Sequence, residues 1–214
     1  MITFEEVELR GPDLKDMEAL QQNISEAEVN PLLASAHYLI SCFGCEEFLK
    51  RKQENARSRS GYLFSIYIDG EGPLGLAELG RIDWRSRNAE LGLWVTKGFQ
   101  DKGYEKKAAV ALLHFAFAEL GLHRVYARTA EDDSILIGLY QKELLFTPEG
   151  AYREHLFHEG KYLNVITFGI LDMEYLTKFG KMEVKIKAQK TRGKTSAQSS
   201  KMEFQEGSKE PVFF

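Results

Sequence analysis

Two different spacings of apolar residues follow each other in the middle of the chain. Residues 89–95 form an apolar run in which Glu90 is the single charge, and this length is typical of a buried strand. From residue 106 to residue 120, apolar side chains recur every three or four positions, which is the period of an α-helix. Gly98 and Gly103 separate the two segments and predict a loop. We therefore expect a strand, a glycine loop, and a helix that packs against a sheet on most of its circumference.

Comparable patterns predict the elements on either side of this unit. Strands are expected at residues 2–9, 62–68, 74–82, 124–129, 151–157 and 162–170. One helix is expected to begin after Asp13, and two more are expected at residues 46–59 and 134–142. The strands before the glycine loop follow one another through short turns, so we expect them to pair antiparallel. The chain is therefore predicted to adopt an α/β (α+β) fold, with a mixed, mainly antiparallel central sheet flanked by helices.

The glycine loop is also a candidate site for an anion. A helix N-terminus presents backbone N–H groups without intrahelical partners, together with the positive end of the helix dipole. Gly103 would let the backbone approach a phosphate closely, and Lys102 adds a positive charge beside it. Many strand–loop–helix units bind nothing, however, so the composition of the loop alone favours a plain structural turn with an exposed lysine.

Residues 99–104, with the sequence Phe-Gln-Asp-Lys-Gly-Tyr, resemble the Gln/Arg-x-x-Gly-x-Gly/Ala acyl-CoA loop of the GNAT N-acetyltransferases. Other stretches are similar to the RimJ/RimL-type branch of that family, which includes ribosomal-protein and spermidine acetyltransferases. They follow in the family's order at residues 74–79, 88–94, 119–125, 139–142, 153–155 and 160–162. The resemblance covers roughly residues 2–171 and implies a GNAT-like fold. It also implies transfer of an acetyl group from acetyl-CoA to a primary amine (a protein N-terminus, a polyamine or a small amine) by direct attack in a ternary complex.

The resemblance places the cosubstrate acetyl-CoA along the end of the central strand and over the glycine loop. Within this stretch, residues 100–104 would hold the pyrophosphate. The residues implied to contact the cosubstrate are Leu93, Trp94, Val95, Gln100, Asp101, Lys102, Gly103, Tyr104 and Glu105.

Two acids of this stretch depart from the family, which usually has a small residue at each of their positions. Asp101 and Glu105 would oppose a phosphate, because like charges about 4 Å apart cost about 1 kcal/mol in water and about 4 kcal/mol at an effective dielectric of about 20. Glu105 lies in the first turn of the predicted helix, where an acid is favourable, and we expect it to face solvent. Lys106 and Lys107 are expected to offset its charge.

Three residues are candidates for the chemistry of acetyl transfer. Tyr140 occupies the place where the family often has a tyrosine on the short helix after the fifth strand, and its phenol would protonate the leaving thiolate. Glu90 is the candidate base, because it is the single acid in an apolar strand beside the implied active centre. Glu78 is a candidate for binding the substrate amine. The alternatives are a core tyrosine at position 140 and solvent-facing acids at positions 78 and 90.

Two further departures fall in the segment that contacts the CoA arm in the family. The family's Asn-x-x-Ser is replaced by residues 133–136, and its Lys-Leu-Gly-Phe becomes residues 142–146, one residue longer and without the glycine. Together, Asp101, Glu105 and Leu145 favour an alternative function, a catalytically impaired acyl-CoA-binding or protein-interaction module on the same fold.

Charge is distributed unevenly along the 214 residues, whose total is −4. Residues 178–214 hold nine basic and four acidic residues, a net charge of +5, so residues 1–177 carry −9. An acidic body favours a cationic amine as substrate and disfavours nucleic acid. We expect residues 1–177 to form the GNAT-like domain and residues 178–214 to form a basic tail, disordered from about residue 181 onward.

The cysteines and the apolar runs indicate the compartment. Cys42 and Cys45 stand alone, whereas a structural zinc site takes four ligands, so we expect two reduced thiols and no metal. No apolar run reaches membrane-spanning length, and the N-terminal residues do not have the pattern of a signal peptide. We therefore expect a cytoplasmic protein without membrane contact, either a monomer or a homodimer.

Overall fold

The computed structural model describes residues 1–26, 34–68, 71–99, 102–158 and 160–187. For residues 23–26, 34–43 and 97 it describes the backbone but not the side chain.

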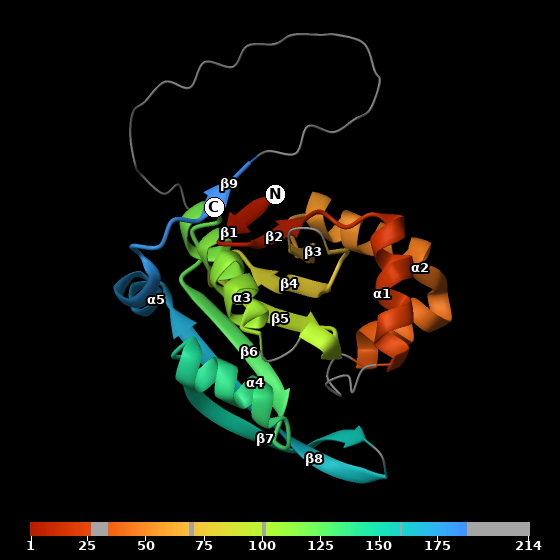
Figure 1. The fold of residues 1–214 in the computed structure, drawn as a ribbon. Coiled ribbons are helices and arrows are strands. Elements are labelled where there is room, and N and C mark those ends of the chain that lie inside the picture. Colours follow the sequence, from red (N-terminus) through yellow and green to blue (C-terminus); the bar gives the residue numbers. More distant parts are fainter. Residues whose placement is uncertain (27–33, 69–70, 100–101, 159, 188–214) are drawn as a thin grey trace, which may run out of the picture.

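Within these residues, nine strands form one sheet (Figure 1). Its order is β7-β8-β6-β5-β4-β3-β2-β1-β9. The strands are β1 (Ile2–Phe4), β2 (Val7–Arg10), β3 (Tyr62–Ile68), β4 (Gly75–Asp83), β5 (Asn88–Val95), β6 (Arg124–Ala130), β7 (Thr147–His158), β8 (Lys161–Leu171) and β9 (Lys185–Ile186). Neighbouring strands pair antiparallel except β5 and β6, which pair in parallel. The predicted mixed, mainly antiparallel sheet is confirmed.

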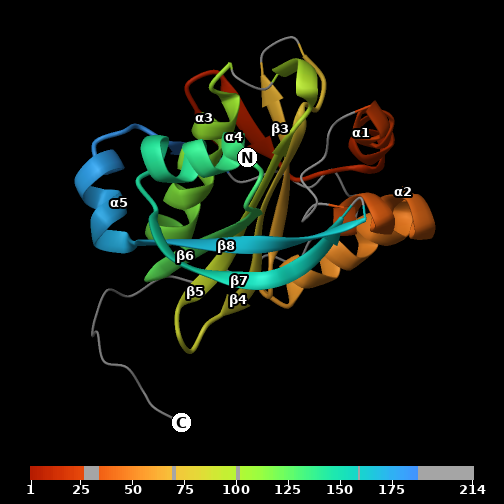
Figure 2. The ribbon, with the colours of Figure 1, turned by 90° about the horizontal axis from the view of Figure 1, so that it is seen from below.

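Helices cover both faces of the sheet. The α-helices are α1 (Leu14–Glu26), α2 (Ala34–Arg57), α3 (Tyr104–His114), α4 (Ser134–Gly138) and α5 (Asp172–Phe179). A short 3₁₀ turn, η1 (Lys97–Phe99), precedes α3, and π-helical turns extend α3 and α4, namely η2 (Phe115–Glu119) and η3 (Leu139–Glu143). Figure 2 shows α1 and α2 on one side of strands β3–β5, and α3, α4 and α5 on the other. We call these sides the α1–α2 face and the α3 face.

The alternation of side chains along β5 builds a core on each face. Ala89, Leu91, Leu93 and Val95 are at most 2% exposed and belong to the main core, with the apolar side of α3. Trp94 instead belongs to a smaller cluster on the α1–α2 face. That cluster consists of Met17, Leu20, Cys45, Phe48, Leu49, Leu63, Leu76 and Trp94.

Two predicted elements near the N-terminus differ from the structure. The single strand expected at residues 2–9 is a hairpin of β1 and β2, because the chain turns at Glu5, whose φ of 52° is outside the strand region. The helix expected at residues 46–59 is the second half of α2, which begins at residue 34 and is kinked at Gly44, with φ 76° and ψ 156°. Asp13 caps α1 as predicted, since its carboxylate accepts a hydrogen bond from the Asp16 N–H at 3.0 Å.

The fold also continues past residue 177. Helix α5 ends at Phe179, and β9 pairs with β1 through Ile2 and Thr3, so the edge of the sheet is formed by residues that the sequence pattern assigned to the tail. Residues 188–214 lie outside the described part of the chain, and a disordered basic tail there stays a prediction.

A substitution at Leu112 measures how much the core under α3 contributes to stability. Its side chain is fully buried, so Leu112→Ala should lower the free energy of unfolding by about 2–5 kcal/mol, because lost apolar burial adds to the cost of a cavity. Leu176→Ala on α5 is the matched control, since Leu176 is 52% exposed. Urea denaturation of both variants measures the difference. Equal effects would contradict this description of the core.

Candidate active site

The parallel pair β5 and β6 separates after a short contact. They pair only at Asn88↔Arg124, Ala89↔Val125 and Glu90↔Tyr126, although β5 continues to residue 95 and β6 to residue 130. Figure 1 shows the two strands diverging beyond this contact. Glu90 therefore lies where the strands part, on the strand that leads into the glycine loop.

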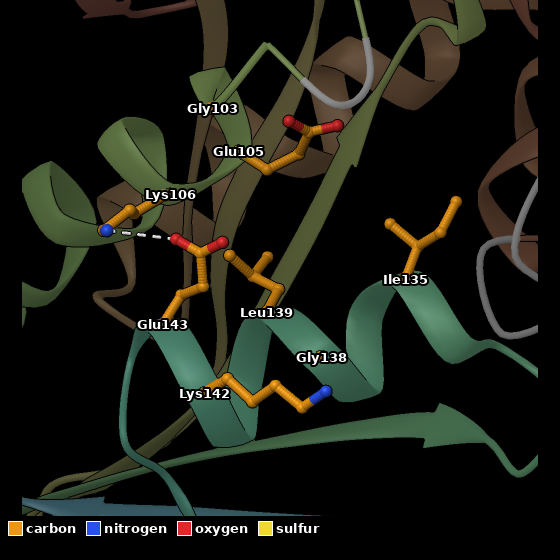
Figure 3. A pocket seen from close by; sticks show the side chains of 8 residues that line it. All are labelled: Gly103, Glu105, Lys106, Ile135, Gly138, Leu139, Lys142 and Glu143. Atoms are coloured by element: carbon orange, nitrogen blue, oxygen red, sulfur yellow. Dashed lines mark ion pairs between the residues drawn. The ribbon is translucent and has the colours of Figure 1, made fainter.

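A cavity of 320 Å³ lies on the α3 face, between α3, which follows the glycine loop, and the α4–η3 segment. One wall is the start of α3 and the other is the α4–η3 segment (Figure 3). Lys106 and Glu143 form an ion pair across the cavity at 3.0 Å. The lining residues are Gly103, Glu105, Lys106, Ile135, Gly138, Leu139, Lys142 and Glu143.

The N-terminus of α3 opens into this cavity. Its N-cap residue is Gly103, which has a φ of 80° and provides no side-chain cap. A non-glycine residue would be strained in this left-handed conformation. The first backbone N–H groups of the helix are therefore not satisfied by a capping side chain, which is the arrangement that binds anions at helix N-termini.

Glu105 occupies the first turn of α3, but the expectation that it faces solvent is wrong. The residue is 8% exposed and lines the cavity, because the helix turns this position toward α4. The neighbouring lysines are held by other acids: Lys106 pairs with Glu143, and Lys107 pairs with Glu5 at 2.9 Å and also with Glu6. Both lysines that were expected to offset the charge of Glu105 are thus engaged by other acids.

Tyr140 lies in the π-helical turn η3 and is buried, with 1% exposure. Its ring packs against Phe146 and Phe168, with centroid distances of 5.5 and 5.6 Å. Burial raises the pKa of the Tyr140 hydroxyl above its ordinary range, and the charges of Asp133 and Glu90 raise it further. The phenol is thus a core residue that stays protonated, and it lies close enough to Glu90 to be affected by its charge.

The Glu90 carboxylate is held by two arginines on the α1–α2 face. Its Oε1 atom accepts a hydrogen bond from the Nε of Arg128 at 2.7 Å, and its Oε2 atom lies 3.0 Å from the Nε of Arg81. The Glu90 and Arg128 side chains are 18% and 19% exposed, so this pair is largely shielded from water. The sequence analysis missed both arginines. Alternation along β6 places Arg128 on the same face as Tyr126, the residue opposite Glu90, and this was the available signal.

Glu78 lies on the same face, one strand away. It is opposite Gly92, and Glu90 is opposite Gly80, so both acids project toward α1 and α2. The ammonium group of Lys52, from α2, lies 2.6 and 2.7 Å from the two Glu78 oxygens. The carboxylate that we expected to bind a substrate amine is therefore engaged by a lysine of the chain itself.

The remaining predicted contacts divide between the two faces. Leu93 and Val95 are buried toward α3, whereas Trp94 is buried toward α1 and α2. Lys102 lies over the ring of Phe99, 4.7 Å from its centroid, at the start of the loop segment before α3. Gln100 and Asp101 lie outside the described residues, and their roles stay predictions.

The α4–η3 wall of the cavity was not identified from sequence as a binding surface. Ile135, Gly138, Leu139 and Lys142 recur at three- and four-residue spacing, so they share one helix face, and this spacing could have indicated it. After this wall, Leu145 has a φ of 58° and is 52% exposed. It thus takes a left-handed conformation that glycine adopts without strain, in the segment where the family has a glycine.

Two kinds of feature are absent from the described part of the chain. No three His, Cys, Asp or Glu side chains there are grouped so that they could hold a metal ion. No helix there is both long and apolar enough to cross a membrane.

Known proteins resemble this chain in sequence and in fold. The model of the Acetyltransferase (GNAT) domain matches residues 6–142. Spermidine N(1)-acetyltransferase of Escherichia coli (strain K12) is 32% identical over 113 residues, which are 53% of this chain and 60% of that protein. The match thus spans less than two thirds of the length of this relative.

Two other similarities extend further along the chain. The uncharacterized N-acetyltransferase p20 of Bacillus licheniformis is 24% identical over 172 residues, which are 80% of this chain and 96% of that protein. A solved chimera of the Vibrio cholerae spermidine N-acetyltransferase SpeG superposes with a TM-score of 0.70 at 23% identity, covering 81% of this chain and 100% of the other. At this identity the superposition supports the fold.

Gly138 offers a direct test of the cavity. It has helical backbone angles, φ −61° and ψ −45°, and a Cβ atom built there meets no other atom within 4 Å. Gly138→Leu should fill the cavity without backbone strain and raise the free energy of unfolding by about 0.5–1 kcal/mol through helix propensity. We expect it to abolish binding of coenzyme A in calorimetry, whereas Gly138→Ala should retain most binding. Wild-type affinity in the leucine variant would show that this cavity is not the binding site.

Proposed function

The chain belongs to the GNAT acetyltransferase family, and we propose that it transfers the acetyl group of acetyl-CoA to a primary amine by direct attack in a ternary complex. The parting of β5 and β6 after Glu90, on the strand that leads through the glycine loop to a cavity at the N-terminus of α3, is the observation that carries this proposal. The two residues proposed for acid–base chemistry come from different parts of the fold: Glu90 from the point on β5 where this strand parts from β6, and Tyr140 from η3, the continuation of the helix that forms one wall of the cavity.

The residues of the cavity fit a phosphate-bearing cosubstrate in most respects. The N-terminus of α3 at Gly103 would bind the pyrophosphate, and Lys142 adds positive charge from the opposite wall. Leu93 and Val95 are buried in the main core at the end of β5, the strand that leads into the glycine loop. When bound, acetyl-CoA supplies the activated acetyl group as a thioester. Two acids line the cavity: Glu143, which is paired with Lys106, and Glu105, whose charge would oppose a phosphate.

Tyr140 is proposed to act as the general acid. Its phenol holds a proton across the physiological pH range, because burial raises the pKa of the hydroxyl above its ordinary range. The proton on the Tyr140 oxygen is therefore available for the leaving thiolate. The neighbouring rings of Phe146 and Phe168 hold the side chain in place and exclude water from it.

Glu90 is proposed to accept the proton that the amine must lose before it attacks. A carboxylate has about four lone-pair sites, and Arg128 and Arg81 use only one on each oxygen. The remaining sites can accept a hydrogen bond from the amine directly or through a water molecule. The two arginines then serve to fix the orientation of the carboxylate.

A second candidate function is favoured by two specific features. Glu105 carries negative charge into the cavity, and Leu145 holds a strained backbone conformation just after the cavity wall. Both would be tolerated in a module of this fold that binds acyl-CoA weakly, or binds a protein, without catalysing transfer. The next two experiments separate this function from the first.

Replacement of the proposed acid should separate catalysis from binding. Tyr140→Phe should lower kcat about 10²- to 10⁴-fold, because the phenolic proton is lost while the ring is kept. The dissociation constant for acetyl-CoA, measured by calorimetry, should stay within about twofold of wild type. Tyr162→Phe, at a 64% exposed position in the β7–β8 hairpin, is the matched control and should leave kcat unchanged. A full-chain protein that binds acetyl-CoA but acetylates no amine would support the non-catalytic module.

Replacement of the opposing acid should strengthen binding of the cosubstrate. Glu105→Gln removes a charge that costs at least about 1 kcal/mol against a phosphate about 4 Å away, so acetyl-CoA should bind at least about fivefold more tightly. Glu119→Gln, an exposed position of η2, makes the same change in net charge and should have no effect. If only the Glu105→Gln variant binds acetyl-CoA in calorimetry, the fold stands and the enzymatic proposal fails.

A further inference from the structure

The α1–α2 face around Glu78 and Glu90 carries an ionic network that contains more cations than anions. We define the acceptor-face network as these two acids with their described partners, Lys52, Arg81 and Arg128. Two carboxylates and three cations leave it with a formal charge of +1. The acidic body of the chain attracts cations at long range, but close to Glu90 both carboxylates are already neutralised.

The Lys52 side chain is held in place by several contacts within this network. Its ammonium group contacts both oxygens of Glu78 and lies 5.4 Å from the centroid of the Phe48 ring, one turn earlier in α2. The side chain is 19% exposed. An amine nitrogen from a ligand would have to displace this ammonium group before it could bind Glu78.

Arg128 retains hydrogen-bonding capacity beside Glu90. A guanidinium group has five N–H donors, and the contact with Glu90 uses the Nε–H of Arg128. The hydrogen bond to Glu90 raises the pKa of Arg128, so the positive charge is permanent at any working pH. The donors of the guanidinium fork match a carboxylate in geometry and charge.

In addition to Arg128, Trp94 provides a hydrogen-bond donor on the same face. The residue is 6% exposed, and its Nε1–H group is buried without a hydrogen-bond partner among the described residues. An unpaired buried donor is costly, so a ligand oxygen that reached the Nε1–H group by displacing the side chains that cover it would remove an existing penalty. Gly92 lies between Glu90 and Trp94 on this face, and a Cβ atom built there would meet only the Cβ of Glu78, at 3.9 Å.

These groups suit an acceptor that presents oxygen atoms next to its amine. A polyamine offers only cationic N–H donors, which cannot pair with Trp94 or Arg128 and are repelled by Lys52. We propose that Lys52 and Arg128 are specificity-determining residues that select an amine carrying a nearby carboxylate and exclude polyamines. The proposal rests on the acetyl transfer proposed above and names the class of its acceptor.

The test compares acceptors in a full-chain assay of coenzyme A release. Spermidine is compared with free glutamate and with a short peptide whose N-terminal residue is aspartate, and a peptide amide without acidic groups is the neutral reference. The wild type should show kcat/KM at least about tenfold higher for one of the acidic acceptors than for spermidine. Glutamate and the peptide distinguish a free amino acid from a protein terminus as the source of the carboxylate.

Two variants test whether the acceptor-face network causes the selectivity between acceptors. Lys52→Gln should free Glu78 and shift the ratio of kcat/KM about tenfold toward spermidine, whereas Lys50→Gln, an exposed position of the same helix, should not. Arg128→Lys keeps the charge but loses the fork, so it should raise KM for the acidic acceptor more than for spermidine. Urea denaturation establishes that each variant is folded.

Binding measurements keep this inference separate from the proposed reaction. Calorimetry of spermidine and glutamate against the protein saturated with coenzyme A reports selectivity even when no acceptor turns over, in which case the proposed function alone fails. Tighter binding or faster acetylation of spermidine by the wild type would overturn the inference. An unchanged ratio in the folded Lys52→Gln variant would overturn the role of Lys52.

Discussion

The short parallel contact between β5 and β6 is the constraint on which the site depends. Three paired positions hold the strands together up to Glu90, and beyond them each strand is held from elsewhere. β5 stays paired with β4 as far as Val95, and β6 stays paired with β8 as far as Ala130. Because both strands are fixed by their outer neighbours, their separation is built into the sheet and does not rely on a mobile loop. The separated ends direct the chain into the glycine loop and set α3 opposite α4.

The two faces of the sheet carry different charges near the point where β5 and β6 part. On the α3 face, an uncapped helix N-terminus and Lys142 favour an anion, while the buried acid Glu105 works against one. On the α1–α2 face, the two acids are each engaged by basic side chains, so these five groups together carry a formal charge of +1. A donor with phosphates and an acceptor with a carboxylate would thus meet from opposite sides at the point where the strands part. This arrangement would hold the amine and the thioester in one orientation, which is the main contribution that a bisubstrate site makes to rate.

Two of the residues that depart from the resemblance are described by the structure: Glu105 lines the cavity, and Leu145 follows its α4–η3 wall. Leu145 adopts the left-handed angles that glycine tolerates, and the segment still returns into β7 at its usual place in the sheet. Glu105 is accommodated in a first turn where the helix dipole favours an acid. The cost of Glu105 falls on the binding of an anion, whereas the cost of Leu145 is a strained backbone, which falls on stability.

The sequence by itself determined the order and type of most elements, because apolar spacing depends only on which face of a local element is buried. It located the strand, glycine loop and helix around Gly103, and it indicated Glu90 and Tyr140 from residue type and resemblance. Only the tertiary structure decided which charges meet: Arg128 and Lys52 reach their acids through strand pairing and a helix distant in sequence. It also turned Glu105 inward and added β9 to the sheet edge, since both depend on neighbours contributed by remote segments. Residue type and local spacing determine the chemistry that a side chain can perform. The packing of elements distant in sequence determines which residues it contacts.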